Sequence, residues 1–452
     1  MLDIAYTFER FCNEIHLHLD EYMTSVAEIV KKLNKCYYDS DSETAHLLVV
    51  GSIGRKTAVE GVSDIDIIFE LPQDVYSRFN AYESNGQSAL LQEIKEELLD
   101  RYPNTEIKGD GQVVDVFFDK YTVELVPGFR QGDNSFKYPD SHDGGSWKTT
   151  DPLPEQKACQ SATTDTNGCF RHVANMLRAW KNHKGFGMGG LLVDTIVYNY
   201  FDQRDVIKTI PYSGYLALCK EVFHYLASQD ASQAYWFAPG SNQKVYNCDN
   251  GAFVSRAKRA HSKLSKADEE SVDEALISVF GRKFAKCIKQ VSGQITESNK
   301  GYDFYSAPNE EYIDDMFPVD ITNRVRIDCK VTQDGFRPFC LSSILGGMTN
   351  HWLSKNKSLR FFIANTDVKI PYEVYWKVRN VGPDAIRRKM ERGQIFKDAG
   401  FEERKEHTDF NGEHYVECYV VKNGVCVARS RIKVPIDVGY IDREHLLGYN
   451  ES

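Results

Sequence analysis

The sequence predicts an α+β fold, in which a mixed sheet with helices and a helical half precede a mostly β, sandwich-like C-terminal domain. Three observations predict it. Strand-like and helical segments alternate in the first third of the chain. Helical periodicity dominates from about residue 168 to 300, and period-two alternation dominates after that. With 452 residues, about three times a common domain length, the chain is expected to form two domains.

The N-terminal part begins with apolar residues at three- and four-residue steps, which predict one amphipathic helix over residues 5–35. The segments after it are expected as strand, strand, helix and hairpin, at 46–50, 64–71, 88–100 and 113–127. Asp119-Lys120 is the expected hairpin turn. Residues 130–165 are rich in Gly, Asp, Ser and Pro, and predict a long functional loop.

The later segments separate a helical half from a β domain. The candidate helices cover residues 169–183, 191–201, 214–227, 252–264 and 271–291. The polar stretch 298–309 predicts a boundary between a domain at 1–305, helical from about 168, and a domain at 310–452. The candidate strands beyond it include 324–333, 359–365, 373–380 and a hairpin through Asn423-Gly424, and a short helix is expected near 383–391.

Composition excludes several classes of protein. The net charge of −10 argues against a chain whose main task is to grip long nucleic acid. No apolar run approaches the ~18–20 residues of a membrane span, and the N-terminus lacks a signal-peptide pattern. We therefore expect a cytoplasmic protein with no membrane partner. Eleven cysteines without a CxxC pair predict reduced thiols, and no histidine pattern predicts a zinc site.

The most informative segment is Gly51-Ser52 followed, eleven residues later, by Asp64-Ile65-Asp66. Alternate side chains of a strand share a face, so Asp64 and Asp66 point the same way while Ile65 points to the core. Neighbouring carboxylates repel each other unless they are solvated or neutralised, and Mg²⁺ is the common neutralising cation. Glycine permits close backbone approach, so Gly51 and Ser52 are candidates to bind a triphosphate.

A third acid is expected from a neighbouring strand. Asp115 and Glu124 are the two candidates, on opposite arms of the 113–127 hairpin. Three acids would suit two metal ions in phosphoryl or nucleotidyl transfer. The candidate that is not a ligand is expected to be a salt-bridged strand residue.

These residues resemble the motifs of polymerase-β-like nucleotidyltransferases. The closer resemblance is to bacterial cGAS/DncV-like nucleotidyltransferases (CD-NTases) of the SMODS type, and it runs from the N-terminal helix to FGRKF (280–284). The segments that carry it are GSIGRKT (51–57), SDIDIIFEL (63–71), TVELVPGF (122–129), WKTTDP (147–152) and NMLRAWK (175–181). The resemblance implies a polymerase-β-like core that joins NTPs, ATP or GTP or both, into a cyclic di- or trinucleotide with release of pyrophosphate. That product would act on a downstream effector in anti-phage defence.

The resemblance also implies roles for single residues. In the family the third metal ligand, usually Asp, stands just before a Val-Pro pair, which favours Glu124 over Asp115. Metal and catalytic roles are implied for Asp64, Asp66 and Glu124, with Mg²⁺ or Mn²⁺ as cofactor. The residues expected to bind nucleotide are Gly51, Ser52, Arg178 and Lys181. The last two are three apart on one helix face, for which a solvated surface is the alternative.

The C-terminal segment, about 313–452, resembles the AGS-C domain, proposed as a nucleotide sensor. The matching segments are FPVDI (317–321), YEVYWKVRNVGPDA (372–385), ERGQI (391–395) and GEHYVECYVVKNGVCVAR (412–429). Trp376 and Arg379 lie at odd spacing on one strand, so they face opposite sides, and Trp376 is expected in the core.

Two other functions stay open from the sequence. One is a template-independent nucleotidyltransferase that acts on RNA or protein, and the other is a catalytically silent nucleotide receptor. The acidic balance disfavours the RNA substrate, and the intact GS and DxD segments disfavour the silent receptor.

Overall fold

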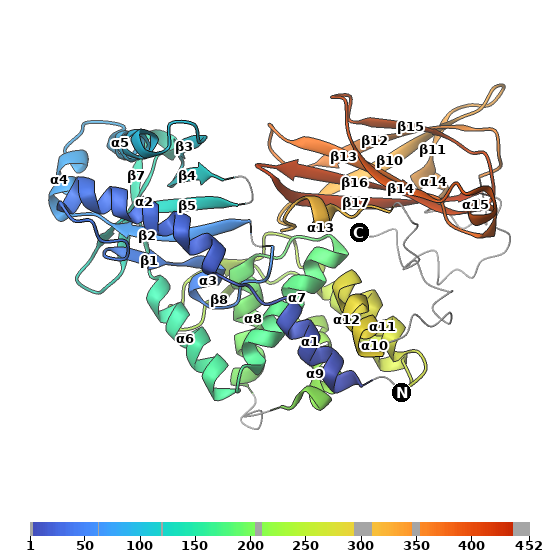
Figure 1. The fold of residues 1–452 in the computed structure, drawn as a ribbon, viewed down its shortest axis with the longest axis horizontal. Helices are drawn as coiled ribbons and strands as arrows, with labels where there is room; N and C mark the ends of the chain where they lie inside the picture. Colours follow the sequence, from blue (N-terminus) through green and yellow to red (C-terminus); the bar gives the residue numbers. More distant parts are fainter. Residues whose placement is uncertain are drawn as a thin grey trace. The chain divides into compact units, whose positions relative to one another are not determined.

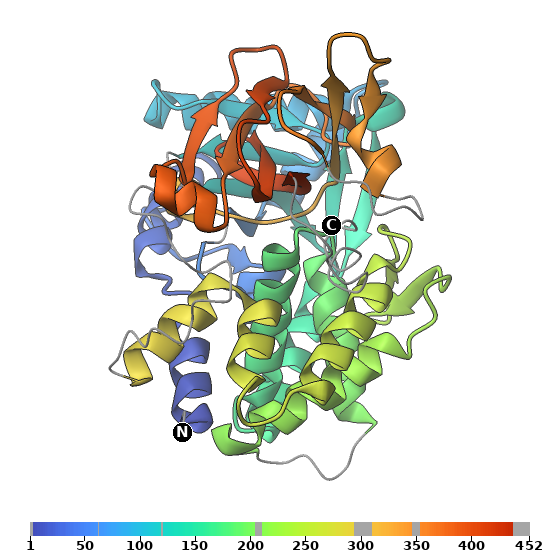
Figure 2. The ribbon, with the colours of Figure 1, turned by 90° about the vertical axis from the view of Figure 1, so that its right-hand side faces the viewer.

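The computed structural model describes residues 3–61, 63–118, 121–203, 210–292, 310–345 and 353–436. They fall into two compact units, which are described separately below (Figures 1 and 2). The first unit comprises Met1–Ala179, Met188–Leu276 and Lys283–Ser292, and the second comprises Trp180–Gly187, Ile277–Arg282 and Gly293–Ser452. The predicted boundary stretch 298–309 and the predicted turn Asp119-Lys120 lie outside the described residues.

A mixed sheet forms the centre of the first unit (Figure 1). Its strands are β1 (Leu47–Val49), β2 (Asp64–Glu70), β3 (Ile107–Asp110), β4 (Val113–Phe117), β5 (Thr122–Arg130), β6 (Phe136–Asp140) and β7 (Ser146–Thr150). The order is β1-β2-β5-β4-β3, with β6 joined to β5 and β7. The pair β2 and β5 is parallel, and the other pairs are antiparallel. The predicted strands and the 113–127 hairpin are thus confirmed.

Helices cover this sheet and build the helical half. They are α1 (Ile4–Glu14), α2 (Asp20–Tyr38), α3 (Gly51–Gly54), α4 (Gln73–Asn80), α5 (Gly86–Arg101), α6 (Pro152–Asp165), α7 (Cys169–Lys184), α8 (Gly190–Asp202), α9 (Tyr215–Ala227), α10 (Ala252–Lys266), α11 (Val272–Phe280) and α12 (Arg282–Ser292). The apolar faces of α2 and α5 share one core with β2, β4 and β5. Because one face of the sheet packs against these helices, polar side chains of the strands point to the opposite face.

Two sequence predictions in this unit are wrong, and so is a third for a segment that spans both units. The helix predicted over 5–35 is two helices, because the backbone at Ile15 and His16 pairs with residues 59 and 60 and cannot continue the helix. Residues 130–165 are not a loop. They form the β6–β7 hairpin and then α6, which begins with Pro152, whose fixed φ suits the first turn. The helix predicted over 271–291 is interrupted at Gly281, whose φ of +80° ends α11.

Two four-stranded sheets pack face to face in the second unit, which confirms the predicted β sandwich. One has the order β11-β10-β12-β15 and the other β14-β13-β16-β17. Their bounds are β10 (Val325–Thr332), β11 (Phe339–Cys340), β12 (Ser358–Thr366), β13 (Glu373–Arg379), β14 (Arg392–Lys397), β15 (Glu403–His407), β16 (Gly412–Lys422) and β17 (Val425–Ile436). The shorter elements are β8 (Tyr235–Phe237) and β9 (Lys244–Tyr246) of the first unit, and α13 (Ile313–Met316), α14 (Leu341–Leu345) and α15 (Pro383–Arg388) of the second.

The core between these sheets follows from strand alternation. Val374, Trp376 and Val378 of β13 point inward and meet apolar residues of β10 and β12. Trp376 is 2% exposed, as predicted. Asn423 and Gly424 join β16 to β17 with φ values of +51° and +76°, the conformation that a type I′ turn requires.

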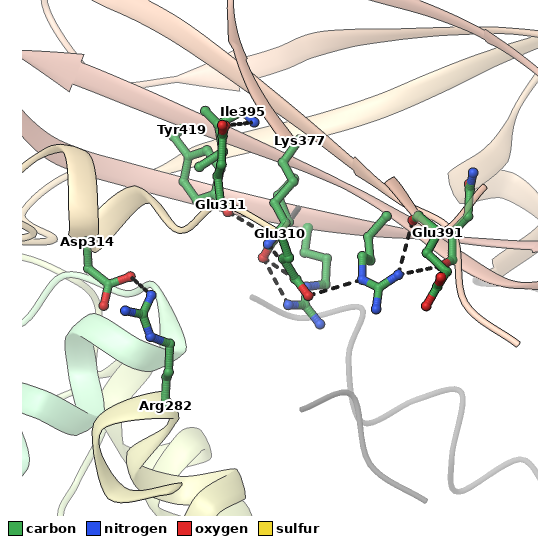
Figure 3. Close-up of polar contacts among 12 residues, drawn as sticks. Arg282, Glu310, Glu311, Asp314, Lys377, Glu391, Ile395 and Tyr419 are labelled. Atoms are coloured by element: carbon green, nitrogen blue, oxygen red, sulfur yellow. Dashed lines mark hydrogen bonds and ion pairs between the residues drawn. The ribbon is translucent and has the colours of Figure 1, made fainter. Parts of the chain in front are cut away.

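The opposite face of the β13–β16–β17 sheet carries buried charges (Figure 3). Lys377 Nζ donates to Glu310 Oε1 at 2.7 Å and lies 4.5 Å from the centre of the Tyr312 ring. Its cross-strand neighbour Glu417 accepts from Arg431 Nη2 at 3.0 Å. Each of these carboxylates thus faces a cation, which offsets the cost of burial.

Within the described residues, no helix is both long enough and apolar enough to cross a membrane.

Candidate active site

Three carboxylates meet on the polar face of the central sheet. Asp64 and Asp66 alternate with Ile65 and Ile67 on β2, and both isoleucines are 0% exposed in the core. Because β2 and β5 are parallel and Asp66 is in register with Glu124, the side chain of Glu124 lies beside that of Asp66. One oxygen from each of Asp64, Asp66 and Glu124 lies within 4.8 Å of the others. The strand period thus brings the three predicted acids together.

The electrostatics of this group favour a cation. Burial first, and then the negative charges of Asp66 and Asp64, raise the pKa of Glu124 well above its ordinary range. Ser63 Oγ donates to Asp64 Oδ1. A divalent cation would remove the repulsion, and carboxylate oxygens are the ligands that Mg²⁺ prefers. The donor set therefore fits a hard divalent metal ion.

Asp115 lies on the other side of Glu124, opposite it on β4. Burial, offset in part by Lys108, raises the pKa of Asp115 to about 6. Its Oδ1 is buried without a hydrogen-bond partner in the described part of the chain. The salt bridge expected for Asp115 is absent among those residues, and the side chain instead extends the row of acids by one strand.

The Gly51–Gly54 turn packs directly against the acids. Val50 N donates to Asp66 O at 2.9 Å, and Gly51 has a φ of +63°. A Cβ on Gly51 would lie 1.8 Å from Asp66 Oδ2, so no larger residue fits there. Ser52 follows, half-buried, at the start of α3. Of the residues predicted to bind phosphate, Gly51 thus lies directly beside the predicted metal ligand Asp66, and Ser52 follows it in the chain.

Arg178 and Lys181 each have protein partners. Arg178 is 5% exposed, and its Nη1 and Nη2 donate to Asp194 at 2.8 and 2.9 Å. Lys181 belongs to the second unit, where its Nζ donates to Asp320 Oδ1 at 2.6 Å and to Ile321 O at 3.1 Å. Neither residue joins the three acids in the described contacts, and their binding of nucleotide stays a prediction.

Sequence reasoning did not identify Arg55, Thr57 and Asp194. Arg55 Nε and Thr57 Oγ1 both donate to Asp194 at 2.8 Å. The available signal was a single acid inside the apolar run LLVDTIVYNYF, because a charge in a buried helix needs a partner.

A GS turn set against a strand-borne DxD pair and a third carboxylate is an arrangement that suits metal-assisted nucleotidyl transfer. Residues 2–162 match the family model of the Second Messenger Oligonucleotide or Dinucleotide Synthetase (SMODS) domain. Residues 307–437 match the model of the Adenylyl/Guanylyl and SMODS C-terminal sensor (AGS_C) domain. The chain thus carries a segment similar to the SMODS domain, followed by a segment similar to the AGS_C domain.

Several solved structures are similar to this chain. CdnC of Escherichia coli MS115-1, in a complex with HORMA-deltaN, has 16% identity and a TM-score of 0.48, covering 62% of this chain and 98% of CdnC. CdnG of Bradyrhizobium diazoefficiens, in complex with GTP, has 11% identity and a TM-score of 0.47, covering 64% and 98%. The DncV cyclic AMP-GMP synthase of Vibrio cholerae has 13% identity and a TM-score of 0.43, covering 63% and 88%. None of the curated proteins matches the chain.

Proposed function

We propose that this protein joins NTPs into a cyclic di- or trinucleotide second messenger, with release of pyrophosphate, in a reaction that requires Mg²⁺ or Mn²⁺. The observation that carries the proposal is the set of three carboxylates beside the GS turn, within a SMODS domain. A reaction that transfers a nucleotidyl group needs positive charge where the phosphates react, and these residues alone supply only negative charge.

Asp64, Asp66 and Glu124 would hold the metal ions. When bound, these ions supply the positive charge that stabilises the attacking and leaving oxygens. The chain's own part is to fix the three carboxylates on two neighbouring strands, so that little reorganisation is needed when substrate arrives. Glu124 also accepts the proton of the attacking ribose hydroxyl, a role that fits its place next to Asp66.

Gly51 and Ser52 hold the donor phosphates in this proposal. The glycine lets the backbone approach closely, and the serine hydroxyl donates a hydrogen bond. Direct contact of Arg178 or Lys181 with phosphate would first break the contacts that each makes now. We therefore give Arg178 an indirect role through Asp194, and the binding of nucleotide by Lys181 stays a prediction.

The two domains would divide the task. Residues 1–305 would carry catalysis, with ATP or GTP or both as substrates, and residues 310–452 would sense a nucleotide and regulate it. The product would act on a downstream effector in anti-phage defence, in the cytoplasm. The division of the task between the domains rests on the SMODS and AGS_C family matches.

The test is incubation with four labelled NTPs and Mg²⁺ or Mn²⁺, followed by phosphatase and mass spectrometry. A small phosphatase-resistant product with the mass of a cyclic oligonucleotide is expected. Label in RNA or protein would favour the template-independent transferase, and no product at all would favour the silent receptor.

A further inference from the structure

A buried ion cluster adjoins the GS turn in the first unit. Its centre is Asp194, which is 0% exposed in the apolar helix α8. The carboxylate accepts from Arg55, from Thr57 and, bidentately, from Arg178. These four hydrogen bonds, each of 2.8 or 2.9 Å, satisfy both oxygens. One side chain of α8 thus joins the segment after the GS turn to α7.

The donors Arg55 and Thr57 are themselves tied to the GS turn. Arg55 N donates to Gly51 O at 3.2 Å, and Thr57 N donates to Ser52 O at 2.9 Å. On its other side the turn meets Asp66, which approaches the position that a Cβ of Gly51 would take. The turn is therefore held between Asp66 and the residues that bind Asp194.

The charges of two arginines keep the buried carboxylate of Asp194 ionised. Two guanidinium groups face one carboxylate, and Arg55 and Arg178 are 7% and 5% exposed. Burial alone would raise the pKa of Asp194, but the charges of Arg178 and Arg55 lower it below its ordinary value. Asp194 is thus ionised, and its charge holds both arginines in place.

We propose that Asp194 is a positioning residue for the donor triphosphate: it fixes Arg55 and Thr57, and through them sets the GS turn against Asp66 before the nucleotide binds. Arg178 acts through Asp194 and not by contact with the nucleotide. The inference rests on the proposed function, because the ligand of the turn is the donor NTP. Preorganised groups of this kind lower the cost of binding, since no loop is ordered on arrival of the ligand.

Thr57→Val isolates this role better than a change at Asp194, which would leave two arginines buried without their partner. Thr57 is 0% exposed, and valine has nearly the same shape without the hydroxyl. Thr57→Ser keeps the hydroxyl and is the matched control. Loss of one hydrogen bond to a carboxylate should raise the KM for NTP about tenfold with a smaller change in kcat, and Thr57→Ser should restore the wild-type KM.

Arg178→Lys provides a second test of the same route. It keeps the charge but loses the bidentate contact with Asp194. Each single variant should raise the KM for NTP. If both residues act through Asp194, the combined Thr57→Val and Arg178→Lys variant should raise KM by less than the product of the two single factors. If the factor for the combined variant equals the product of the two single factors, the two residues act independently, and a shared action through Asp194 is contradicted.

Amide hydrogen exchange on the full chain gives a readout that does not need activity. Thr57→Val should speed exchange at residues 50–58 but not in α10, and Thr57→Ser should not. A lower melting temperature with unchanged KM and unchanged exchange at 50–58 would overturn the proposal and leave Asp194 a structural brace. If the wild-type chain makes no product from NTPs, the proposed function fails, and the exchange pattern alone still decides whether Asp194 fixes the turn.

Discussion

Two groups of carboxylates, one buried and one half-buried, have opposite electrostatic surroundings. In the C-terminal unit, burial would raise the pKa of Glu417, but Arg431 and Lys377 lower it to about 2. On the central sheet of the first unit, burial and the neighbouring Asp66 and Asp64 both raise the pKa of Glu124. Burial acts in the same direction at both places, so the neighbouring charges decide the outcome.

The difference separates acids whose charge the chain's own cations offset from acids that raise one another's pKa. Glu417, like Asp194 of the first unit, receives its cations from the chain itself and needs nothing more. Asp64, Asp66 and Glu124 face one another, and a bound metal ion would supply the missing positive charge. The mutual repulsion of these three acids thus marks the candidate active site independently of any sequence motif.

The largest effect is expected from Asp64→Asn combined with Asp66→Asn. Product formation should fall about a thousandfold or more, because the ligand charges are lost. In EDTA the variant should melt no lower than the wild type, since repulsion on the sheet is relieved. Asp100→Asn, at a carboxylate that is 78% exposed on α5, is the control and should leave turnover unchanged. Full NTP turnover in the double variant would end the catalytic interpretation.

Glu417→Gln should act in the opposite way, on stability. It leaves the buried Lys377 and the half-buried Arg431 with one carboxylate fewer, which should cost about 3 kcal/mol in the free energy of unfolding. Glu403→Gln, which loses a partly exposed pair with Arg360, should cost about 0.5 kcal/mol or less. Denaturant unfolding measures both values. Equal losses would remove the distinction between buried and exposed pairs.

The free energy of unfolding at acid pH should also report the contribution of Glu417. Because the folded-state pKa of Glu417 is lowered from 4.5 to about 2, its contribution is present above pH 4.5 and is lost as the pH falls toward 2. That contribution is about 3 kcal/mol, and Glu417→Gln should remove it from the pH profile. A wild-type profile and a variant profile of the same slope between pH 4.5 and 2 would contradict the assignment.

A smaller difference in turnover is expected between variants of the neighbouring acids Glu124 and Asp115. Glu124→Gln should lower turnover about a hundredfold, and Asp115→Asn only a few-fold, because Asp115 is one strand further from Asp66. Initial rates with Mg²⁺ measure both. An inactive Asp115→Asn beside an active Glu124→Gln would assign the third ligand to β4 instead of β5.

The sequence predicts those features that depend on short-range periodicity. Strand alternation places Asp64 and Asp66 on one face and Trp376 in the core, and Asn423-Gly424 predicts its own turn. Contacts between residues far apart in the chain produce no local pattern in the sequence. The break after α1 depends on pairing with residues 59 and 60. The partners of Arg178 and Lys181 lie 16 and 139 residues further along the chain. Roles assigned to single cations were therefore the least predictable part of the site.

The most direct test of the account is the melting temperature of the wild-type protein with EDTA and with increasing Mn²⁺, beside the Asp64→Asn and Asp66→Asn double variant. Because a ligand that binds the folded state stabilises it by mass action, Mn²⁺ should raise the wild-type melting temperature. In the variant the same titration should give no rise. A wild-type melting temperature that does not change with Mn²⁺, or an equal rise in both proteins, would contradict the claim that these acids form a metal site.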